Sequence, residues 1–308
     1  MTAPSGLLIV DKPAGLTSHD VVGRVRRLAG TRRVGHAGTL DPMATGVLVV
    51  GIEKATRLLG HLALTQKQYA ATIRLGERTD TDDADGEVVE RHPADGVTDA
   101  GLRQAAAALT GEIQQVPPGI SAIKVGGQRA YRLTREGAPP DLPARTVTVS
   151  ELDITGIRRS AGPAGTVLDV DALVTCSSGT YIRAIARDLG AALGTGGHLT
   201  ALRRTRVGPY RIEDATPLDE LAAAAEAAPG GAGALPVIPL AAAAAAAFDA
   251  RQLTADEARL IGHGGRLPAL GAGPAPVAAF GPDGALIALL TESDGQARSL
   301  AVFAAGES

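Results

Sequence analysis

Short β-branched apolar runs and helical patterns follow one another along this chain without regular order, and this irregularity limits the fold more than any other feature. The strand-like runs lie at 7–10, 47–52, 68–75, 147–157, 167–175 and 207–212. Helical spacing recurs around 98–109 and 182–193, and in a segment that Ser18 is expected to cap and Gly30 to close. A parallel βαβ fold would need regular alternation. The sequence therefore predicts an α/β (α+β) protein with a mixed, largely antiparallel sheet and flanking helices.

The composition divides the chain into unequal parts. Residues 1–220 carry nearly all of these patterns, interrupted at about 115–146 by a Gly-, Pro- and Arg-rich segment typical of a functional loop. Residues 221–247 consist mostly of Ala, Gly and Pro, which predicts a linker with helical alanine stretches. Residues 248–308 contain a short helical pattern and three short apolar runs, which predict a small β-rich C-terminal module.

The single cysteine, Cys176, cannot form an internal disulfide and fits a reducing, cytoplasmic location. We interpret it as a small core residue rather than a reactive thiol. The first residues do not form a secretory signal, and no apolar stretch predicts a membrane span. The six histidines lack metal-binding spacing, so no metal is expected.

The net charge of −3 hides an uneven distribution of charge. Residues 221–308 carry four basic and eight acidic side chains, and acids also concentrate in 77–87. Arginines concentrate in 24–33, which holds five, and in 202–208, which holds three. Such clusters are typical either of a surface that neutralises phosphates or of ordinary solvated helix faces.

The stretch GHAGTLDPMATGVLVV holds one carboxylate, Asp41, directly before a predicted buried strand. The proline after it disfavours helical angles, and Gly35 and Gly38 permit unusual backbone conformations before it. Asp41 is therefore either a rigidly held functional acid or a plain turn residue.

The stretch CSSGTYIRAIARDLG places Thr180 as a candidate cap of a helix, with Arg183 in its first turn. The helix dipole disfavours a cation there, so Arg183 suggests a compensating anion. Asp41 could be this anion; alternatively, Arg183 is an ordinary surface residue. Tyr69 and Tyr181 are candidate platforms for stacking a base, with core packing as the alternative.

Several motifs together resemble the bacterial pseudouridine synthases that modify uridine 55 in the T-loop of tRNA. The matching stretches cover residues 6 to about 220 in the family's order, and they are DKPAGLTSHD, GHAGTLDPMATGVL, YAATIRLGERTDTDDADGE, SAIKVGGQRAYRLTREG, and CSSGTYIRAIARDLG with HLTALRRTRVG. The resemblance implies an isomerisation without cofactor, in which a flipped uridine loses its glycosidic bond and is rejoined through C5.

The resemblance also implies roles for individual residues. Asp41 matches the nucleophile, which attacks either the ribose C1′ or the uracil C6. Tyr69 matches the residue that stacks on the base and assists removal of the C5 proton, and Arg183 matches the arginine that pairs with the nucleophile.

The resemblance implies substrate contacts as well. His36 would fill the space left by flipped nucleotides, Tyr181 would line the pocket, and Leu202 would pack against the base. Lys12 is shared with the family, with a more structural role expected.

The family resemblance predicts tRNA, through its T-arm, as the partner, with no membrane, guide RNA or obligate protein partner. The segment at 115–146 matches an RNA-clamping insertion, although Ile120 stands where many members have an aromatic residue. The residues after 247 resemble, more weakly, a PUA-type RNA-binding module. Two alternatives are a hydrolase that pairs Asp41 with an acid from 77–87, and an RNA-binding protein without chemistry.

Overall fold

The computed structural model describes residues 4–119, 124–125, 128–129, 142–227 and 235–303, so Ile120 and most of the predicted RNA-clamping insertion lie outside the described residues. The chain forms two compact units. The first contains Met1–Asp41, Gly46–Leu64 and Val207–Ser308, and the second contains Pro42–Thr45 and Thr65–Arg206. These units are defined by packing and do not follow the composition changes at 220 and 247.

The first unit is built around β3 (Thr45–Ile52). Strand β1 (Gly6–Lys12) runs antiparallel to β3, and β2 (Val34–Ala37) also pairs with β3 in the antiparallel sense. Two short strands extend the other edge of β1, with β14 (Thr216–Pro217) parallel and β15 (Ile238–Pro239) antiparallel to it.

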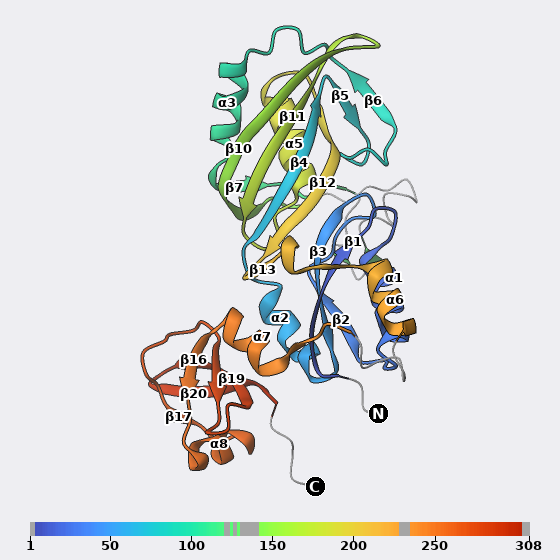
Figure 1. The fold of residues 1–308 in the computed structure, drawn as a ribbon. Helices are drawn as coiled ribbons and strands as arrows, with labels where there is room; N and C mark the ends of the chain where they lie inside the picture. The colour runs from blue at the N-terminus through green and yellow to red at the C-terminus, as the bar shows by residue number, and fades with distance from the viewer. Residues whose placement is uncertain (1–3, 120–123, 126–127, 130–141, 228–234, 304–308) are drawn as a thin grey trace. The chain divides into compact units, whose positions relative to one another are not determined.

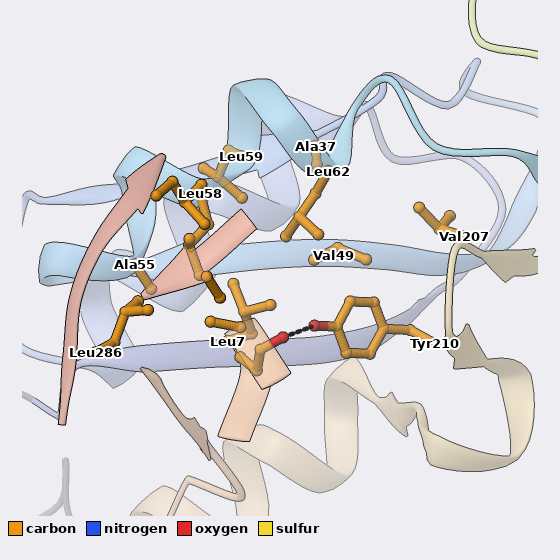
Figure 2. Packing of buried hydrophobic residues seen from close by; sticks show 14 of the residues in the cluster. Leu7, Ala37, Val49, Ala55, Leu58, Leu59, Leu62, Val207, Tyr210 and Leu286 are labelled. Carbon is orange, nitrogen blue, oxygen red and sulfur yellow. Dashed lines mark hydrogen bonds between the residues drawn. The ribbon is translucent and has the colours of Figure 1, made fainter. Parts of the chain in front are cut away.

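Both faces of this sheet are covered by apolar side chains, as the continuous apolar run in β3 predicts. Leu48 and Val50 pack into a core with α1 (Ser18–Leu28). Val47 and Val49 pack on the opposite face in a second core. Figure 2 shows part of this second core. The short helices of this region are η1 (Glu53–Leu58), α2 (Leu59–Leu62) and η2 (Ile212–Asp214).

Helix α1 begins one residue earlier than the sequence suggested. Its N-cap is Thr17, whose hydroxyl accepts from the Asp20 amide, while the Asp20 carboxylate accepts from the Thr17 amide. The prediction that Ser18 caps the helix is therefore wrong, because Ser18 is fully buried and bonds elsewhere. The prediction that Gly30 closes the helix is confirmed by its φ of 63°.

The alanine-rich residues after 220 contribute to the cores of the first unit. Leu221 of α6 (Leu218–Ala227) is fully buried beside α1. Helix α7 (Leu240–Ala247) buries Ala243, whose carbonyl accepts a 3.0 Å hydrogen bond from the Tyr210 hydroxyl (Figure 2). The described residues between 221 and 247 therefore do not act only as a linker, because some of their side chains are buried in the cores of the first unit.

The C-terminal residues form a small β-rich module within the first unit. Its five-stranded sheet has the order β16 (Asp249–Gln252), β18 (Val277–Phe280), β19 (Leu286–Ser293), β20 (Gln296–Val302) and β17 (Leu267–Pro268), and α8 (Ala255–Gly262) belongs to the same module. One face forms a core of its own, whereas Phe280 and Leu286 join the core of Leu7 and Val49 (Figure 2). The expected C-terminal β module is thus present.

The second unit is a twisted sheet with long strands (Figure 1). Its strands follow the order β12 (Gly197–Val207), β4 (Lys67–Leu75), β11 (Gly165–Cys176), β10 (Arg145–Gly162) and β7 (Gly111–Gln115). The pairs β4–β11, β11–β10 and β10–β7 are antiparallel. The predicted mixed, largely antiparallel sheet with flanking helices is confirmed.

Helices cover one face of this second sheet. Helix α5 (Ile182–Ala192) packs against β4, and α3 (Asp99–Ala108) packs against β10 (Figure 1). The predicted alternation along β4 is confirmed, since Tyr69, Ala71 and Ile73 are buried on one face. The remaining elements are the hairpins β5 (Glu77–Thr79) with β6 (Val88–Arg91) and β8 (Lys124–Val125) with β9 (Gln128–Arg129).

The strand expected at 207–212 is wrong. The main strand, β12, ends at Val207, and only β13 (Tyr210–Arg211) follows it. The arginines within β12 conceal its pattern, because Arg204 is a charged residue at a fully buried position of the strand.

Candidate active site

The peptide before Asp41 is held by a buried serine. The Ser18 hydroxyl accepts a 2.9 Å hydrogen bond from the Leu40 amide and donates to the Leu40 carbonyl at 3.2 Å. Ser18 and Leu40 are both buried, whereas Asp41 is partly exposed. The segment thus fixes its backbone next to a partly exposed Asp41. Gly38 has a φ of 80°, which supports its predicted unusual conformation.

Lys12 lies beneath the loop that leads into α1. It is fully buried, and its Nζ donates to the carbonyls of Pro13 at 2.9 Å and of Leu16 at 2.6 Å. These bonds stabilise the connection between β1 and α1, which agrees with the structural role expected for Lys12. A direct contact with substrate stays a prediction.

His36 lies on β2 and is half-buried. Its ring meets the ring of His19 from α1 edge to face, with 5.5 Å between centroids and an interplanar angle of 82°. This contact orients His36, whose role toward RNA stays a prediction.

The second unit holds Tyr69, Leu202, Arg183 and Tyr181. Tyr69 and Leu202 come from the strands β4 and β12 and are nearly buried. Leu202 also lines a surface hollow of about 430 Å³ together with Met43 and Thr72. Asp41 belongs to the other compact unit, so its expected pairing with Arg183 stays a prediction.

Arg183 lies in the first turn of α5, as predicted, and the anion that compensates it within this unit is Asp83. Its Nη1 lies 3.4 Å from Asp83 Oδ2 and donates to the Thr81 carbonyl at 2.9 Å. Both partners of the ion pair are buried. The sequence indicated an anion beside Arg183 but did not identify this member of the acidic run.

The neighbouring acid Asp82 is also engaged. Its Oδ2 lies 3.4 Å from Arg187 Nη1, and burial raises its pKa although Arg187 lowers it. Asp82 and Asp83 thus each face an arginine of α5, and neither of these two acids is the unpaired second acid of the hydrolase alternative.

Tyr181 is held by a residue that the sequence reasoning missed. The Gln115 side chain accepts a 2.8 Å hydrogen bond from the Tyr181 amide and donates to the Tyr181 carbonyl at 3.1 Å. Gln115 is almost fully buried at the end of β7. The prediction that Thr180 caps α5 is wrong, because its hydroxyl donates to the Ser177 carbonyl.

Lys67, Cys176 and Arg204 are buried together at the start of β4. Burial, and to a smaller extent the cation of Arg204, lowers the pKa of Lys67 to about 8. Burial also raises the pKa of Cys176 to about 11, so its thiol is protonated at neutral pH. Cys176 therefore behaves as the core residue that we expected.

One member of the second arginine cluster is not exposed for phosphate binding. Arg204 is fully buried, Arg203 donates to the Thr45 hydroxyl at 3.3 Å, and Arg206 donates to Gln66 at 3.2 Å. The interpretation of this cluster as a surface for RNA phosphates is wrong for Arg204.

Among the residues that the structure describes, none form a group of three or more His, Cys, Asp or Glu side chains able to hold a metal ion. Within the same part of the chain, no helix has the length and apolar character needed to cross a membrane. The candidate catalytic groups are the carboxylate of Asp41 in one unit, and the buried Arg183 with the two tyrosines, Tyr69 and Tyr181, in the other.

The fold matches that of RNA-associated proteins. A solved structure of an H/ACA RNP bound to a substrate RNA containing 2′-deoxyuridine superposes with a TM-score of 0.72 and 25% sequence identity, covering 98% of this chain and 86% of that chain. Sequence families identify the class more closely. Residues 26–182 match the N-terminal domain of the TruB family pseudouridylate synthases. Residues 183–233 match the C-terminal domain of tRNA pseudouridylate synthase B, and 248–304 match the C-terminal region of tRNA pseudouridine synthase II. The class is thus that of the pseudouridylate synthases, which are isomerases.

Relatives align over nearly the whole chain. The tRNA pseudouridine synthase B of Thermobifida fusca is 62% identical, covering 97% of this chain and 98% of that protein. The enzyme of the same name from Arthrobacter sp. is 58% identical and covers 97% of both chains. The chain belongs to the TruB family of pseudouridylate synthases, and the family predicted from the motifs is confirmed.

Proposed function

We propose that this enzyme converts uridine 55 of the tRNA T-loop to pseudouridine, with Asp41 as the nucleophile. The observation that carries the substrate assignment is the identity of 62% over 97% of the chain with a tRNA pseudouridine synthase B. The fixed loop supports the assignment of Asp41, because Ser18 holds the adjoining peptide while Asp41 is partly exposed.

The reaction conserves all atoms of the nucleotide. The target base is flipped out of the loop, and the Asp41 carboxylate attacks the ribose C1′ or the uracil C6. The bond between N1 and C1′ breaks, a bond between C5 and C1′ forms, and the bond between Asp41 and the attacked carbon breaks, which returns the free carboxylate. The proton leaves C5 while N1 regains one. No redox partner is required, and we propose that the enzyme works without a cofactor.

The remaining residues support this attack. Tyr69 stacks on the base and assists removal of the C5 proton. Arg183, oriented by Asp83, keeps the nucleophile ionised when the substrate excludes water. Tyr181 lines the pocket and Leu202 packs against the base.

We propose that the enzyme recognises its tRNA substrate through the T-arm. His36 fills the space left by flipped nucleotides, and the insertion at 115–146 clamps the RNA. The catalytic region extends over 1–220, with 221–247 joining it to a PUA-like module at 248–308. We propose that the enzyme acts in the cytoplasm, without guide RNA or an obligate protein partner.

Asp41→Asn tests the nucleophile. Tritium release from C5-labelled tRNA should fall more than about 1,000-fold, while the Kd for tRNA should stay within several-fold. The mass of the isolated nucleoside distinguishes isomerisation, which leaves it unchanged, from hydrolysis, which releases free uracil. Residual turnover above that level would contradict the assignment of Asp41.

Tyr69→Phe tests the role of Tyr69 in proton removal, and an isolated T-arm hairpin tests recognition through the T-arm. The phenylalanine variant should bind tRNA and form product very slowly, since it retains stacking but lacks the hydroxyl. The hairpin should be modified at a rate approaching that of whole tRNA under single-turnover conditions. An inert hairpin would show that recognition extends beyond the T-arm.

A further inference from the structure

Three arginines line an open hollow at the C-terminal end of α1, two from the last turn of the helix and one from the segment that follows it. The hollow has a volume of about 570 Å³ and is lined by Arg26, Arg27, Gly30, Thr31 and Arg32. It opens broadly to solvent, so a polymer can lie across it. We call it the arginine hollow.

The backbone beneath the arginine hollow is firmly held. The Gly30 amide donates to the Arg27 carbonyl at 3.3 Å, and the Thr31 amide donates to the Arg26 carbonyl at 3.2 Å. With the positive φ of Gly30, these two bonds form a Schellman motif that fixes the chain as it leaves the helix. Arg26 also donates from Nη2 to the Val34 carbonyl at 3.1 Å. The backbone beneath the hollow and the side chain of Arg26 are therefore held before any ligand binds.

The charges of this hollow lack acidic partners. Arg27 and Arg32 are exposed, and neither forms an ion pair with any residue in the described ranges. The nearby acid, Glu53, is engaged instead by the Thr31 hydroxyl and by Arg33, at 3.7 Å from Oε2 to Nη1. The helix dipole accounts for cations in the last turn of α1, but not for Arg32, which follows the end of the helix.

Two exposed arginines of the second unit differ from those of the hollow. Arg158 is paired with Asp171, and Arg159 Nη2 lies 2.6 Å from Asp99 Oδ1. Arg158 and Arg159 thus have acidic partners, whereas Arg27 and Arg32 have none among the described residues and lie around a hollow. This contrast favours a ligand that supplies the negative charge.

We propose that the arginine hollow binds consecutive phosphates of the RNA substrate's backbone, apart from the loop that carries Asp41. Guanidinium groups match phosphate oxygens in a forked geometry, and an open hollow fits a backbone that passes across it. Such contacts set the register of the RNA without reading its sequence. The identity of the RNA as tRNA rests on the proposed function.

The test is the double variant Arg27→Gln/Arg32→Gln in the full chain. The Kd for an unmodified tRNA transcript is measured at several salt concentrations. Loss of two phosphate contacts should weaken binding about tenfold near physiological salt and reduce the log–log salt slope by about 1.4 to 1.8. Arg27→Lys/Arg32→Lys retains both charges and should keep most of the wild-type slope.

Arg158→Gln/Arg159→Gln is the matched control, because it removes the same two charges from arginines that already have acidic partners. It should change the Kd and the slope little. An unchanged slope in the Arg27/Arg32 double variant, or an equal loss in the control, would overturn the proposal. If the double variant does not fold, each single Gln variant should lower the slope by about half as much.

The outcome is separable from the proposed function. If the wild-type enzyme binds tRNA but leaves uridine unconverted, the proposed function fails, and the salt slopes still decide the role of the arginine hollow. Absence of tRNA binding by the wild-type enzyme would overturn both.

Discussion

Replacing Ser18 by alanine should disconnect the reactive carboxylate from its scaffold. The Ser18 hydroxyl makes two hydrogen bonds to the peptide groups of Leu40, at 2.9 and 3.2 Å, and is fully buried. Each such bond contributes about 1 kcal/mol, and a buried amide or carbonyl left unpaired costs about 1–3 kcal/mol. The Leu40 segment should therefore lose about 2–4 kcal/mol of its local stability.

The catalytic effect follows from the position of Leu40 next to Asp41. A shift of about 1 Å in a reactive group can lower the rate about 100-fold. We expect a single-turnover rate on tRNA reduced by about that factor at saturating enzyme. The Kd for tRNA should stay within several-fold, because Ser18 is buried and is not among the residues that line the arginine hollow.

Thr17→Ala provides the matched control for Ser18→Ala. It removes the N-cap of the same helix, which typically costs about 1 kcal/mol, but leaves both bonds to Leu40 in place. Its single-turnover rate should stay within about twofold of wild type, with unfolding followed in urea for both variants. If Ser18→Ala reacts at a near-normal rate, or if Thr17→Ala is slowed as much as Ser18→Ala, the two hydrogen bonds between Ser18 and Leu40 do not position Asp41.

Three further predictions concern the second unit. Asp83→Asn should lower the single-turnover rate at least about 100-fold by leaving Arg183 without its buried anion, whereas Asp82→Asn should act much less. Gln115→Leu should lower both the rate and the urea stability, the latter by about 2 kcal/mol, because it releases the start of α5. The pKa of Lys67 is lowered from 10.5 to about 8 in the folded chain, so the unfolded chain binds more protons between these pH values. The contribution of Lys67 to the free energy of unfolding should therefore rise with pH across that window by up to about 3 kcal/mol, while Cys176, whose pKa is raised to about 11, acts in the opposite direction above pH 9; in urea titrations the stability difference between wild type and Lys67→Met should accordingly grow from pH 8 to 10.5.

The elements with regular apolar spacing were predictable from the sequence. Alternation along 68–75 predicted the buried face of β4, and helical spacing with Gly30 predicted the course and end of α1. These features depend on neighbours within a few residues, so a local pattern is sufficient. The strand β12 was missed in its larger part, since a buried Arg204 interrupts its apolar pattern.

The polar contacts around the candidate site could not be predicted in the same way. Ser18 and Leu40 are 22 residues apart, and Gln115 and Tyr181 are 66 apart. Nothing in the local pattern distinguishes Ser18 from a cap residue, and the neighbouring Thr17 competes for that role. Arg183 showed only that an anion should exist, because its position breaks the dipole rule.

The two pairs of hydrogen bonds, from Ser18 to Leu40 and from Gln115 to Tyr181, hold the backbone in the same way in different units. We call each pair a clamp. Leu40, which precedes Asp41, has its amide and its carbonyl hydrogen-bonded by the side chain of Ser18. Tyr181, which precedes α5, has its amide and its carbonyl hydrogen-bonded by the side chain of Gln115. Holding the backbone this way costs little side-chain freedom at the reactive residue itself, because the bonds involve only the main chain. The backbone beside Asp41 and at the start of α5 is thus held by bonds that do not use the side chains of Asp41 and Tyr181, to which we assign the proposed contacts with the substrate. Since each clamp needs a partner far away in the sequence, its formation also requires that the unit around it has folded, which ties the geometry of the site to the integrity of each core.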